Sequence, residues 1–258
     1  MSLTNFSRSI SEHIAVVTGA ASGMGEATAK LFASEGALVA AIDVNEEGLN
    51  RVVDEISSEG KSAKGWILDL SDGEEIKRVF DEIAEHFGGI DILVNNAGIS
   101  IPSPIDDDNY ESNWSRSMDI LITAQTKTIR ASLPYIRKSD NPRIVNIAST
   151  EGFGATKFGS PYTAAKHAVI GLTRSLAVEL GTEGITVNCI CPGPVRTGMT
   201  EAIPEESKQI YARRRIALRR YADPEEVAHG TLNFVLPASG FMTGATLPVD
   251  GGLTIKNA

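Results

Sequence analysis

Three residues in the second half of the chain have side chains and a spacing suited to proton transfer. Tyr162 and Lys166 stand four residues apart in Tyr-Thr-Ala-Ala-Lys, and Ser149 lies thirteen residues before the tyrosine. Residues four apart share one face of a helix, so the Lys166 ammonium can lie beside the Tyr162 phenol. A nearby positive charge favours phenolate and lowers the pKa of a phenol, which is otherwise near ~10. Such a tyrosine can exchange a proton with an alcohol oxygen near neutral pH, and Ser149 can hold that oxygen.

This pattern alone is weak evidence, because a tyrosine at helical spacing is more often half-buried packing. Its context comes from the alternation of apolar and amphipathic segments along the chain. We expect strands at residues 14–18, 37–42, 63–68, 90–94, 143–148, 186–190 and 246–249. We expect helices at residues 24–35, 46–58, 73–87, 110–137, 162–180 and 224–235.

Near-continuous apolar strands separated by helices imply a parallel sheet covered on both faces. Right-handed crossovers then give a doubly wound α/β fold with about seven strands. No linker, repeat or low-complexity stretch divides the chain. We therefore predict one domain over residues 1–258, with a short disordered segment at about residues 1–10.

A glycine-rich loop follows the first expected strand and opens the first expected helix. Its sequence is Thr18-Gly19-Ala20-Ala21-Ser22-Gly23-Met24-Gly25. Gly19 permits a tight turn, Gly23 lets the backbone approach a pyrophosphate, and Gly25 allows close helix–strand packing. The helix N-terminus adds free N–H groups and a partial positive charge. A merely tight turn is the alternative, but the position between strand and helix favours a dinucleotide site.

Two aspartates follow the next two expected strands. Asp43 ends the second strand, where a carboxylate accepts hydrogen bonds from ribose hydroxyls and repels a 2′-phosphate. No arginine or lysine lies in the glycine loop or directly after Asp43. These features favour NAD over NADP. Asp69, with Leu70, ends the third strand and either reaches the adenine amino group or serves as a turn or N-cap residue.

Composition excludes several other classes of function. A net charge of -9 gives no electrostatic reason to bind nucleic acid or an anionic membrane. The arginines at 213–215 and 219–220 are an exception that we interpret as solvated or subunit-facing rather than as a phosphate site. Cys189 and Cys191 have poor spacing for a metal ligand pair, so we expect two buried thiols and no metal. With no signal peptide or apolar run of about 20 residues, we expect a cytoplasmic protein.

The chain resembles the short-chain dehydrogenase/reductase family, an NAD-dependent type with a Rossmann-like fold, from about residue 14 to residue 252. The resemblance rests on several motifs that occur in family order. They are the glycine loop, Asp69, Asn95-Asn96-Ala97-Gly98, the Ser149, Tyr162 and Lys166 set, Pro192-Gly193 with Thr197, and Asp250-Gly251-Gly252. The resemblance implies an oxidoreductase acting on a CH–OH group.

Residue roles follow from the same resemblance. It implies that Tyr162 is the general acid/base, that Ser149 orients the substrate oxygen, and that Lys166 lowers the pKa of the tyrosine and binds the nicotinamide ribose. It implies that Asn95 steadies the sheet. The expected cofactor-contacting residues are Gly19, Ser22, Gly23, Met24, Gly25, Asp43, Asp69, Leu70, Asn96, Ala97, Gly98, Tyr162, Lys166, Pro192, Gly193, Val195 and Thr197.

One position departs from the family pattern. Family members carry an asparagine seven residues after a tryptophan in the long helix, and counting from Trp114 gives Leu121. In the family that asparagine holds a water that connects the lysine to solvent. Leucine cannot hold it, so another group or water path substitutes, proton exchange is slower, or a shorter relay suffices.

The combined hypothesis is reversible NAD-dependent oxidation of a secondary alcohol to a ketone. Family position places Ser100, Ile101, Glu151, Phe153 and Met199 around the substrate, with a mobile lid over residues 198–220. Glu151 either binds a substrate hydroxyl or cation or is a solvent-facing loop acid. The family also implies a homotetramer. The alternatives are an NADPH-dependent ketone or 3-oxoacyl reductase of the same fold and a non-catalytic nucleotide-binding regulatory protein, which only Leu121 supports.

Overall fold

The computed structural model describes residues 7–257, and within them a seven-stranded parallel sheet forms the centre of the molecule. Its order is β3-β2-β1-β4-β5-β6-β7, and every neighbouring pair is parallel. The strands are β1 (Ile14–Thr18), β2 (Leu38–Asp43), β3 (Ala63–Ile67), β4 (Ile92–Asn95), β5 (Arg143–Ile147), β6 (Thr186–Pro192) and β7 (Thr246–Val249). Every residue of β1, β4, β5 and β6 is buried, as expected for strands covered on both faces.

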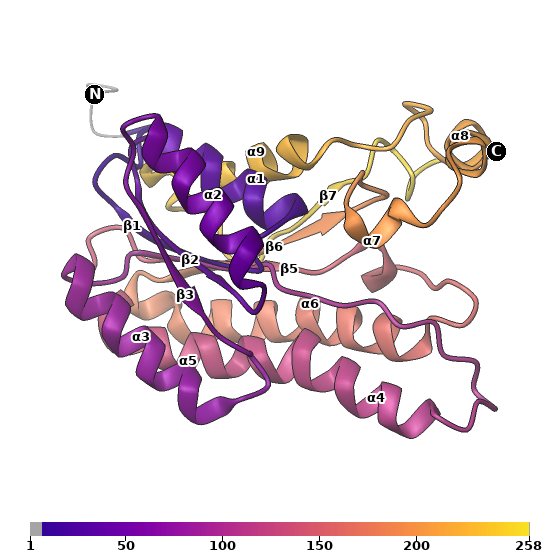
Figure 1. The fold of residues 1–258 in the computed structure, drawn as a ribbon, viewed down its shortest axis with the longest axis horizontal. Coiled ribbons are helices and arrows are strands. Elements are labelled where there is room, and N and C mark those ends of the chain that lie inside the picture. Colours follow the sequence, from indigo (N-terminus) through magenta and orange to yellow (C-terminus); the bar gives the residue numbers. More distant parts are fainter. Residues whose placement is uncertain (1–6, 258) are drawn as a thin grey trace.

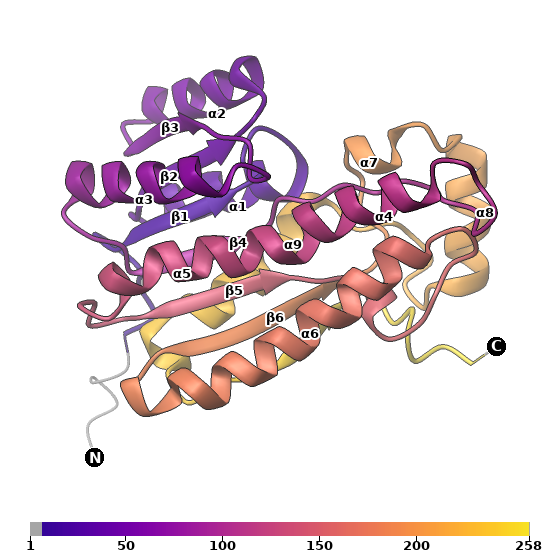
Figure 2. The ribbon, with the colours of Figure 1, turned by 90° about the horizontal axis from the view of Figure 1, so that it is seen from below.

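Helices cover both faces of this sheet. Figure 1 shows α1 (Gly23–Ser34), α2 (Glu46–Ser58) and α9 (Pro224–Val235) on one side. On the other side lie α3 (Gly73–Phe87), α4 (Tyr110–Met118), α5 (Ala124–Ile136) and α6 (Ser160–Leu180), as Figure 2 shows from below. Two apolar clusters, one on each side, hold these layers to the sheet. The predicted doubly wound α/β fold is confirmed.

The strand order changes direction between β1 and β4. From β1 the chain moves outward to β2 and β3, and then returns to the other side of β1 with β4. Loops at the carboxyl ends of β1 and β4 therefore diverge, and this point is where open α/β sheets bind ligands. The glycine loop after β1 and Asn96-Ala97-Gly98 after β4 both lie there.

The expected long helix over residues 110–137 is interrupted. Its middle, residues 119–123, is a π-helical turn, η2 (Asp119–Thr123), between α4 and α5. The pattern of apolar residues predicted the extent of this segment, but a π turn leaves no clear period in so short a stretch. Leu121 lies in this turn and is fully buried.

The segment at residues 198–220 contains helices that the sequence analysis did not assign. They are α7 (Gly198–Glu201) and α8 (Glu205–Arg215), which Figure 1 places at one end of the molecule, close to the C-terminus. The α8 sequence is strongly polar and buries only Lys208 and Ala212, so it has no apolar stripe to reveal a helix.

Most of the N-terminal segment expected to be disordered, residues 1–6, lies outside the described residues. Its last residues do not fit that expectation, because Ile10 is fully buried in the core. The carbonyl of Ser7 accepts a hydrogen bond from the N–H of Ala238 at 2.8 Å. A single apolar residue in a polar stretch was too weak a signal to predict this contact.

Candidate active site

The glycine loop turns sharply between β1 and α1. Gly19 and Gly23 have positive φ angles of 68° and 56°, which side chains other than glycine rarely adopt. A Cβ on Gly25 would lie 1.9 Å from the carbonyl oxygen of Gly19, so the helix start is pressed against the loop itself. Ser22 is the N-cap of α1, and its side chain makes no capping hydrogen bond. The first turn of the helix is therefore not closed by its own cap, which suits an anion.

Asn96 connects this loop to β4. Its side-chain amide donates to the carbonyls of Thr18 at 2.9 Å and Gly19 at 3.3 Å. Its backbone N–H donates to the hydroxyl of Thr18 at 3.0 Å. The Oδ1 atom of Asn96 is buried and has no hydrogen-bond partner among the described residues. Asn96 thus braces the loop and leaves one acceptor for a ligand.

Asp43 ties the end of β2 to the same loop. One carboxylate oxygen accepts from the N–H of Ala21 at 3.0 Å, and the other accepts from the N–H of Asn45 at 2.9 Å. Arg51 also reaches the loop, because its guanidinium donates to the carbonyl of Ala21 at 3.3 Å. That guanidinium is paired with Glu26 and Glu55, so much of its charge is already compensated. Arg51 was not predicted to lie here, because it is eight residues beyond Asp43 in the chain.

Asp69 is an exposed residue in the turn after β3. It accepts a hydrogen bond from the N–H of Ser71 at 2.9 Å, and this backbone bond holds the pKa of its carboxyl below its usual value. The N-cap of the following helix is Asp72, not Asp69. Asp69 is therefore a turn aspartate that also lines the cavity described next.

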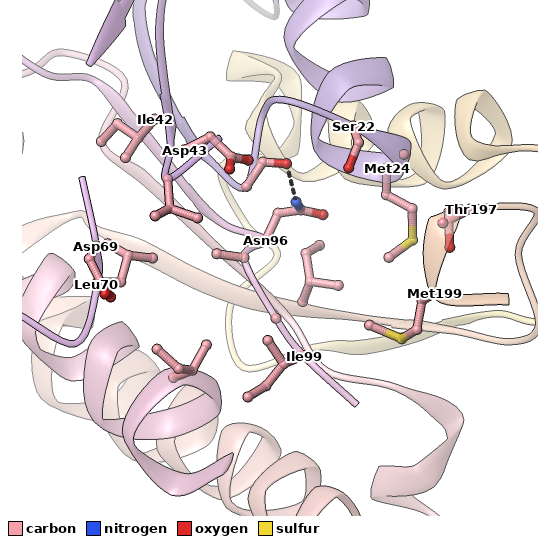
Figure 3. A pocket seen from close by; sticks show the side chains of 18 of the residues that line it. Ser22, Met24, Ile42, Asp43, Asp69, Leu70, Asn96, Ile99, Thr197 and Met199 are labelled. Carbon is pink, nitrogen blue, oxygen red and sulfur yellow. Dashed lines mark hydrogen bonds between the residues drawn. The ribbon is translucent and has the colours of Figure 1, made fainter. Parts of the chain in front are cut away.

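A cavity of about 480 Å³ runs along the carboxyl ends of β1, β2, β4 and β5, within the size range of small-molecule sites. Figure 3 shows Asp43, Ser22 and Asn96 around one part and Asp69 with Leu70 at another. The expected residues that line it are Gly19, Ser22, Gly23, Met24, Asp43, Asp69, Leu70, Asn96, Ala97, Gly98, Tyr162, Lys166, Thr197 and Met199. The fold therefore brings the glycine loop and the Tyr162–Lys166 pair to one cavity.

Other expected residues lie behind or beside the wall of this cavity. Gly25 packs on Gly19, and Gly193 is pressed against Asp250, where a Cβ would come within 2.8 Å of the Asp250 Cα. The expected residues absent from the lining are Gly25, Pro192, Gly193, Val195, Ser149, Ser100, Ile101, Glu151 and Phe153.

Some lining residues escaped the sequence analysis. They are Ile42, Val44, Leu68, Ile99, Arg116, Ile120, Ile147 and Ala148. Most directly neighbour a predicted site residue at a strand end, so position alone was a usable signal. Arg116 and Ile120 come from α4 and η2, and only the packing of that helix across the sheet places them in the cavity.

Lys166 is buried in α6, and its ammonium donates to the carbonyl of Ile147 at 2.8 Å. Its Nζ atom lies 5.5 Å from the centre of the Tyr162 ring. Burial lowers the pKa of Lys166 to about 8, an effect that the neighbouring thiols of Cys189 and Cys191 partly oppose. The predicted proximity of the amine and the phenol is present.

The expected low pKa of Tyr162 is not what the protein alone shows. Burial raises the pKa of Tyr162 to about 12, and the side chain of Ser149 only partly opposes this shift. The physical reason is that packing removes much of the water around both groups and so disfavours the charged form of each. The Lys166 ammonium is also directed at a backbone carbonyl rather than at the phenol oxygen. We predicted a low pKa for Tyr162 from the positive charge of Lys166 and did not include the desolvation of the two side chains.

Leu121 and Lys166 lie on either side of Gly98. A Cβ on Gly98 would lie 3.2 Å from a Leu121 methyl group and 3.9 Å from the Lys166 Nζ. Gly98 thus separates the two side chains and keeps open the cavity in front of the amine. Leu121 offers no polar atom at this place, as the sequence analysis expected.

Next to the cavity lies a more exposed surface, which includes Met199 from the cavity lining. Phe153 is 45% exposed, Met199 52% and Tyr211 40%. Glu151 is half-buried, and the nearby 153–159 loop is largely exposed. These residues come from the loop after β5 and from the α7–α8 segment.

Cys189 and Cys191 are free, buried and 4.0 Å apart between their sulfur atoms. Among residues 7–257, no group of three or more histidine, cysteine, aspartate or glutamate side chains is placed to hold a metal ion. None of the helices in that range is both long and apolar enough to cross a bilayer.

Comparison with known proteins gives the family. A sequence model described as Enoyl-(Acyl carrier protein) reductase matches residues 19–254. The chain is 36% identical over 242 residues to the 3-oxoacyl-[acyl-carrier-protein] reductase FabG of Thermotoga maritima, covering 94% of this chain and 98% of that one. It is 36% identical over 244 residues to meso-2,3-butanediol dehydrogenase of Serratia marcescens, covering 95% of both chains.

A solved structure gives the same result. The blue fluorescent protein from a metagenomic library, in complex with NADPH, superposes with a TM-score of 0.88 at 30% identity, covering 95% of this chain and 99% of that one. The chain belongs to the short-chain dehydrogenase/reductase family of oxidoreductases. The open first turn of α1, the unpaired Oδ1 of Asn96 and the space before Gly98 fit a nicotinamide dinucleotide.

Proposed function

We propose that the protein catalyses the reversible, NAD-dependent oxidation of a secondary alcohol to a ketone. The observation that carries this proposal is that Tyr162 and Lys166 line the same cavity as the glycine loop and Asp43. Gly19, Gly23 and the N-terminus of α1 would hold the pyrophosphate, and Asp43 the adenosine ribose. When bound, NAD⁺ supplies a hydride acceptor and a positive charge.

Tyr162 is the base of the proposed reaction. A positive charge that enters the cavity favours phenolate, and so lowers the pKa of Tyr162 from about 12 toward neutral pH. Phenolate then takes the hydroxyl proton of the alcohol as the carbinol carbon loses hydride. Ser149 donates a hydrogen bond to the developing oxyanion. In ketone reduction the same groups act in reverse.

Tyr162→Phe tests this role, because it removes the hydroxyl and little else. We expect turnover to fall about 10³-fold, within the range for loss of a general acid/base. NADH affinity, measured by fluorescence titration, should change less than about threefold. Tyr135→Phe is the matched control on α5, since Tyr135 bonds to Asp81 away from the cavity. Normal turnover in the Tyr162 variant would refute the proposed chemistry.

The second candidate is an NADPH-dependent reductase of ketones or 3-oxoacyl groups. It is favoured by the similarity to the Thermotoga reductase, by the NADPH complex of the metagenomic protein, and by Arg51 at the glycine loop. The Asp43 carboxylate and the pairing of Arg51 with Glu26 and Glu55 favour NAD instead. KM values for both cofactors, measured with a panel of diols, cyclic alcohols and 3-oxoacyl thioesters, separate the two.

A non-catalytic nucleotide sensor is the third candidate, and Leu121 beside Lys166 is its support. A protein of this kind should bind the dinucleotide tightly and should turn over none of the diols, cyclic alcohols or 3-oxoacyl thioesters.

We also propose a homotetramer. Val178 on α6 is 82% exposed, and Phe241, before the edge strand β7, is fully exposed. Apolar side chains left in water at these two places suit subunit contacts. Sedimentation equilibrium that gives a monomer would contradict this assembly.

A further inference from the structure

Glu151 lies between the two proposed catalytic side chains in the chain. Ser149 is the N-cap of a short 3₁₀ turn, η3 (Thr150–Gly152), and Tyr162 stands at the start of α6. Residues 153–159 connect them and form a largely exposed loop. A loop of this kind does not by itself fix the distance between a serine and a tyrosine.

The Glu151 carboxylate accepts three hydrogen bonds across this loop. One oxygen accepts from the hydroxyl of Thr156 at 2.6 Å. The other accepts from the N–H of Thr156 at 2.9 Å and from the hydroxyl of Thr163 at 2.7 Å. Thr163 directly follows Tyr162 on α6. The carboxylate therefore joins the turn after Ser149, the middle of the loop and the helix turn that carries the tyrosine.

The same turn orients Ser149. The backbone N–H of Glu151 donates to the Ser149 hydroxyl oxygen at 3.1 Å, so that oxygen already accepts one hydrogen bond. The serine proton remains available to donate into the site. Gly152 packs the turn directly on α6, since a Cβ there would lie 3.1 Å from the Lys166 carbonyl oxygen.

Glu151 also contributes charge to the site. Burial is the main cause that raises the pKa of Tyr162 and of Tyr211 on α8, and the Glu151 carboxylate adds to both shifts. Lys166 on α6 and the thiol of Cys191 on β6 also face the phenol of Tyr162. Arg215 on α8 acts on Tyr211 in the opposite direction to Glu151.

These contacts favour a third role over the two that the sequence left open. A solvent-facing acid would not be half-buried with three internal donors. A carboxylate that binds a substrate cation needs free acceptor sites, and three of the four lone-pair sites of Glu151 are already engaged within the chain. Charge-assisted hydrogen bonds of this kind are stronger than neutral ones and fix geometry.

We propose that Glu151 is a positioning residue that locks the Ser149 turn to the Tyr162 helix and moves the pH range of the reaction upward. The pH part of this inference rests on the proposed function. The positioning role does not rest on the proposed function, because it concerns only the hydrogen bonds that hold the loop. The negative charge of Glu151 disfavours phenolate, so its removal makes the phenolate form of Tyr162 accessible at lower pH.

The test compares a variant that removes the charge of Glu151 with a variant that removes one hydrogen bond to it. Glu151→Gln keeps the size and removes the charge, whereas Thr163→Val keeps the charge and removes one donor. For alcohol oxidation we expect the rising limb of the kcat/KM–pH profile to move about 0.5 to 1 pH unit lower in Glu151→Gln. We expect the limb to stay in place in Thr163→Val while the plateau falls about threefold to tenfold. Glu179→Gln, an exposed acid on α6, is the control for both.

Amide hydrogen exchange tests the positioning part without turnover. The N–H of Thr156 donates to Glu151, so we expect it to exchange at least tenfold faster in Glu151→Ala, and NADH affinity to change less than threefold. Unchanged exchange in that variant would overturn the positioning role. If the rising limb of the kcat/KM–pH profile stays in place in Glu151→Gln, the pH role of Glu151 is overturned. If the wild type turns over no substrate, the proposed function fails, and the exchange result still decides the positioning role.

Discussion

The proposed nucleotide side of the cavity and the proposed substrate surface next to it are built differently. On the nucleotide side, Asp43 and Asn96 bind backbone groups of the glycine loop, and Gly19 and Gly25 leave no room for a methyl group. On the substrate side, a Cβ on Gly154 would meet nothing within 4 Å, and Phe153 and Met199 are about half exposed. One side is fixed by contacts at the ends of buried strands. The other is a surface that can change without disturbing the sheet.

Gly25→Ala should have the largest effect, and that effect should fall on the nucleotide side. Its methyl group would collide with the Gly19 carbonyl, so the loop and the start of α1 must separate. We expect NADH affinity, measured by calorimetry, to fall by roughly 100-fold or more, with a lower unfolding temperature. Gly154→Ala is the matched change on the substrate side and should change the free energy of unfolding by less than about 0.5 kcal/mol. Equal effects of the two substitutions would show that the nucleotide side is not the more constrained one.

Asp43→Ala should have an intermediate effect, on cofactor choice. The variant loses the carboxylate that repels a 2′-phosphate, and the N–H groups of Ala21 and Asn45 lose their acceptor. We expect the ratio of KM for NADP to KM for NAD to fall about tenfold or more, with weaker NAD binding. Asp54→Ala, an exposed acid on α2, controls for the loss of one charge. An unchanged ratio would remove Asp43 from the basis of cofactor preference.

Phe153→Ala should have the smallest effect, confined to the substrate side. The ring is 45% exposed and lines no part of the nucleotide cavity. We expect KM for the alcohol to rise about threefold to tenfold through lost apolar contact, while NADH affinity stays within about twofold. Steady-state kinetics and fluorescence titration measure the two constants. If NADH affinity fell by as large a factor as the KM for the alcohol rises, the two sides would not be independent.

Local sequence determined the fold and the nucleotide side. The periodicity of apolar residues and the residue types at the strand ends predicted the doubly wound sheet, the glycine loop and Asp43. These features could be predicted because each depends on residues within one strand–turn–helix unit. The same reasoning placed Tyr162 and Lys166 on one helix face. It failed at residues 198–220, where α8 has almost no apolar face, and at the π turn around Leu121.

What the tertiary structure decided was the environment of those groups. Sequence alone placed an amine beside a phenol, but only packing shows that both lose water, which moves the pKa of Tyr162 up and that of Lys166 down. Packing also shows that Arg51 reaches the glycine loop and that Glu151 is bound by two threonines. Spacing along a helix sets which side chains share a face. Desolvation and hydrogen-bond partners depend on residues far apart in sequence, so only the folded chain determines them.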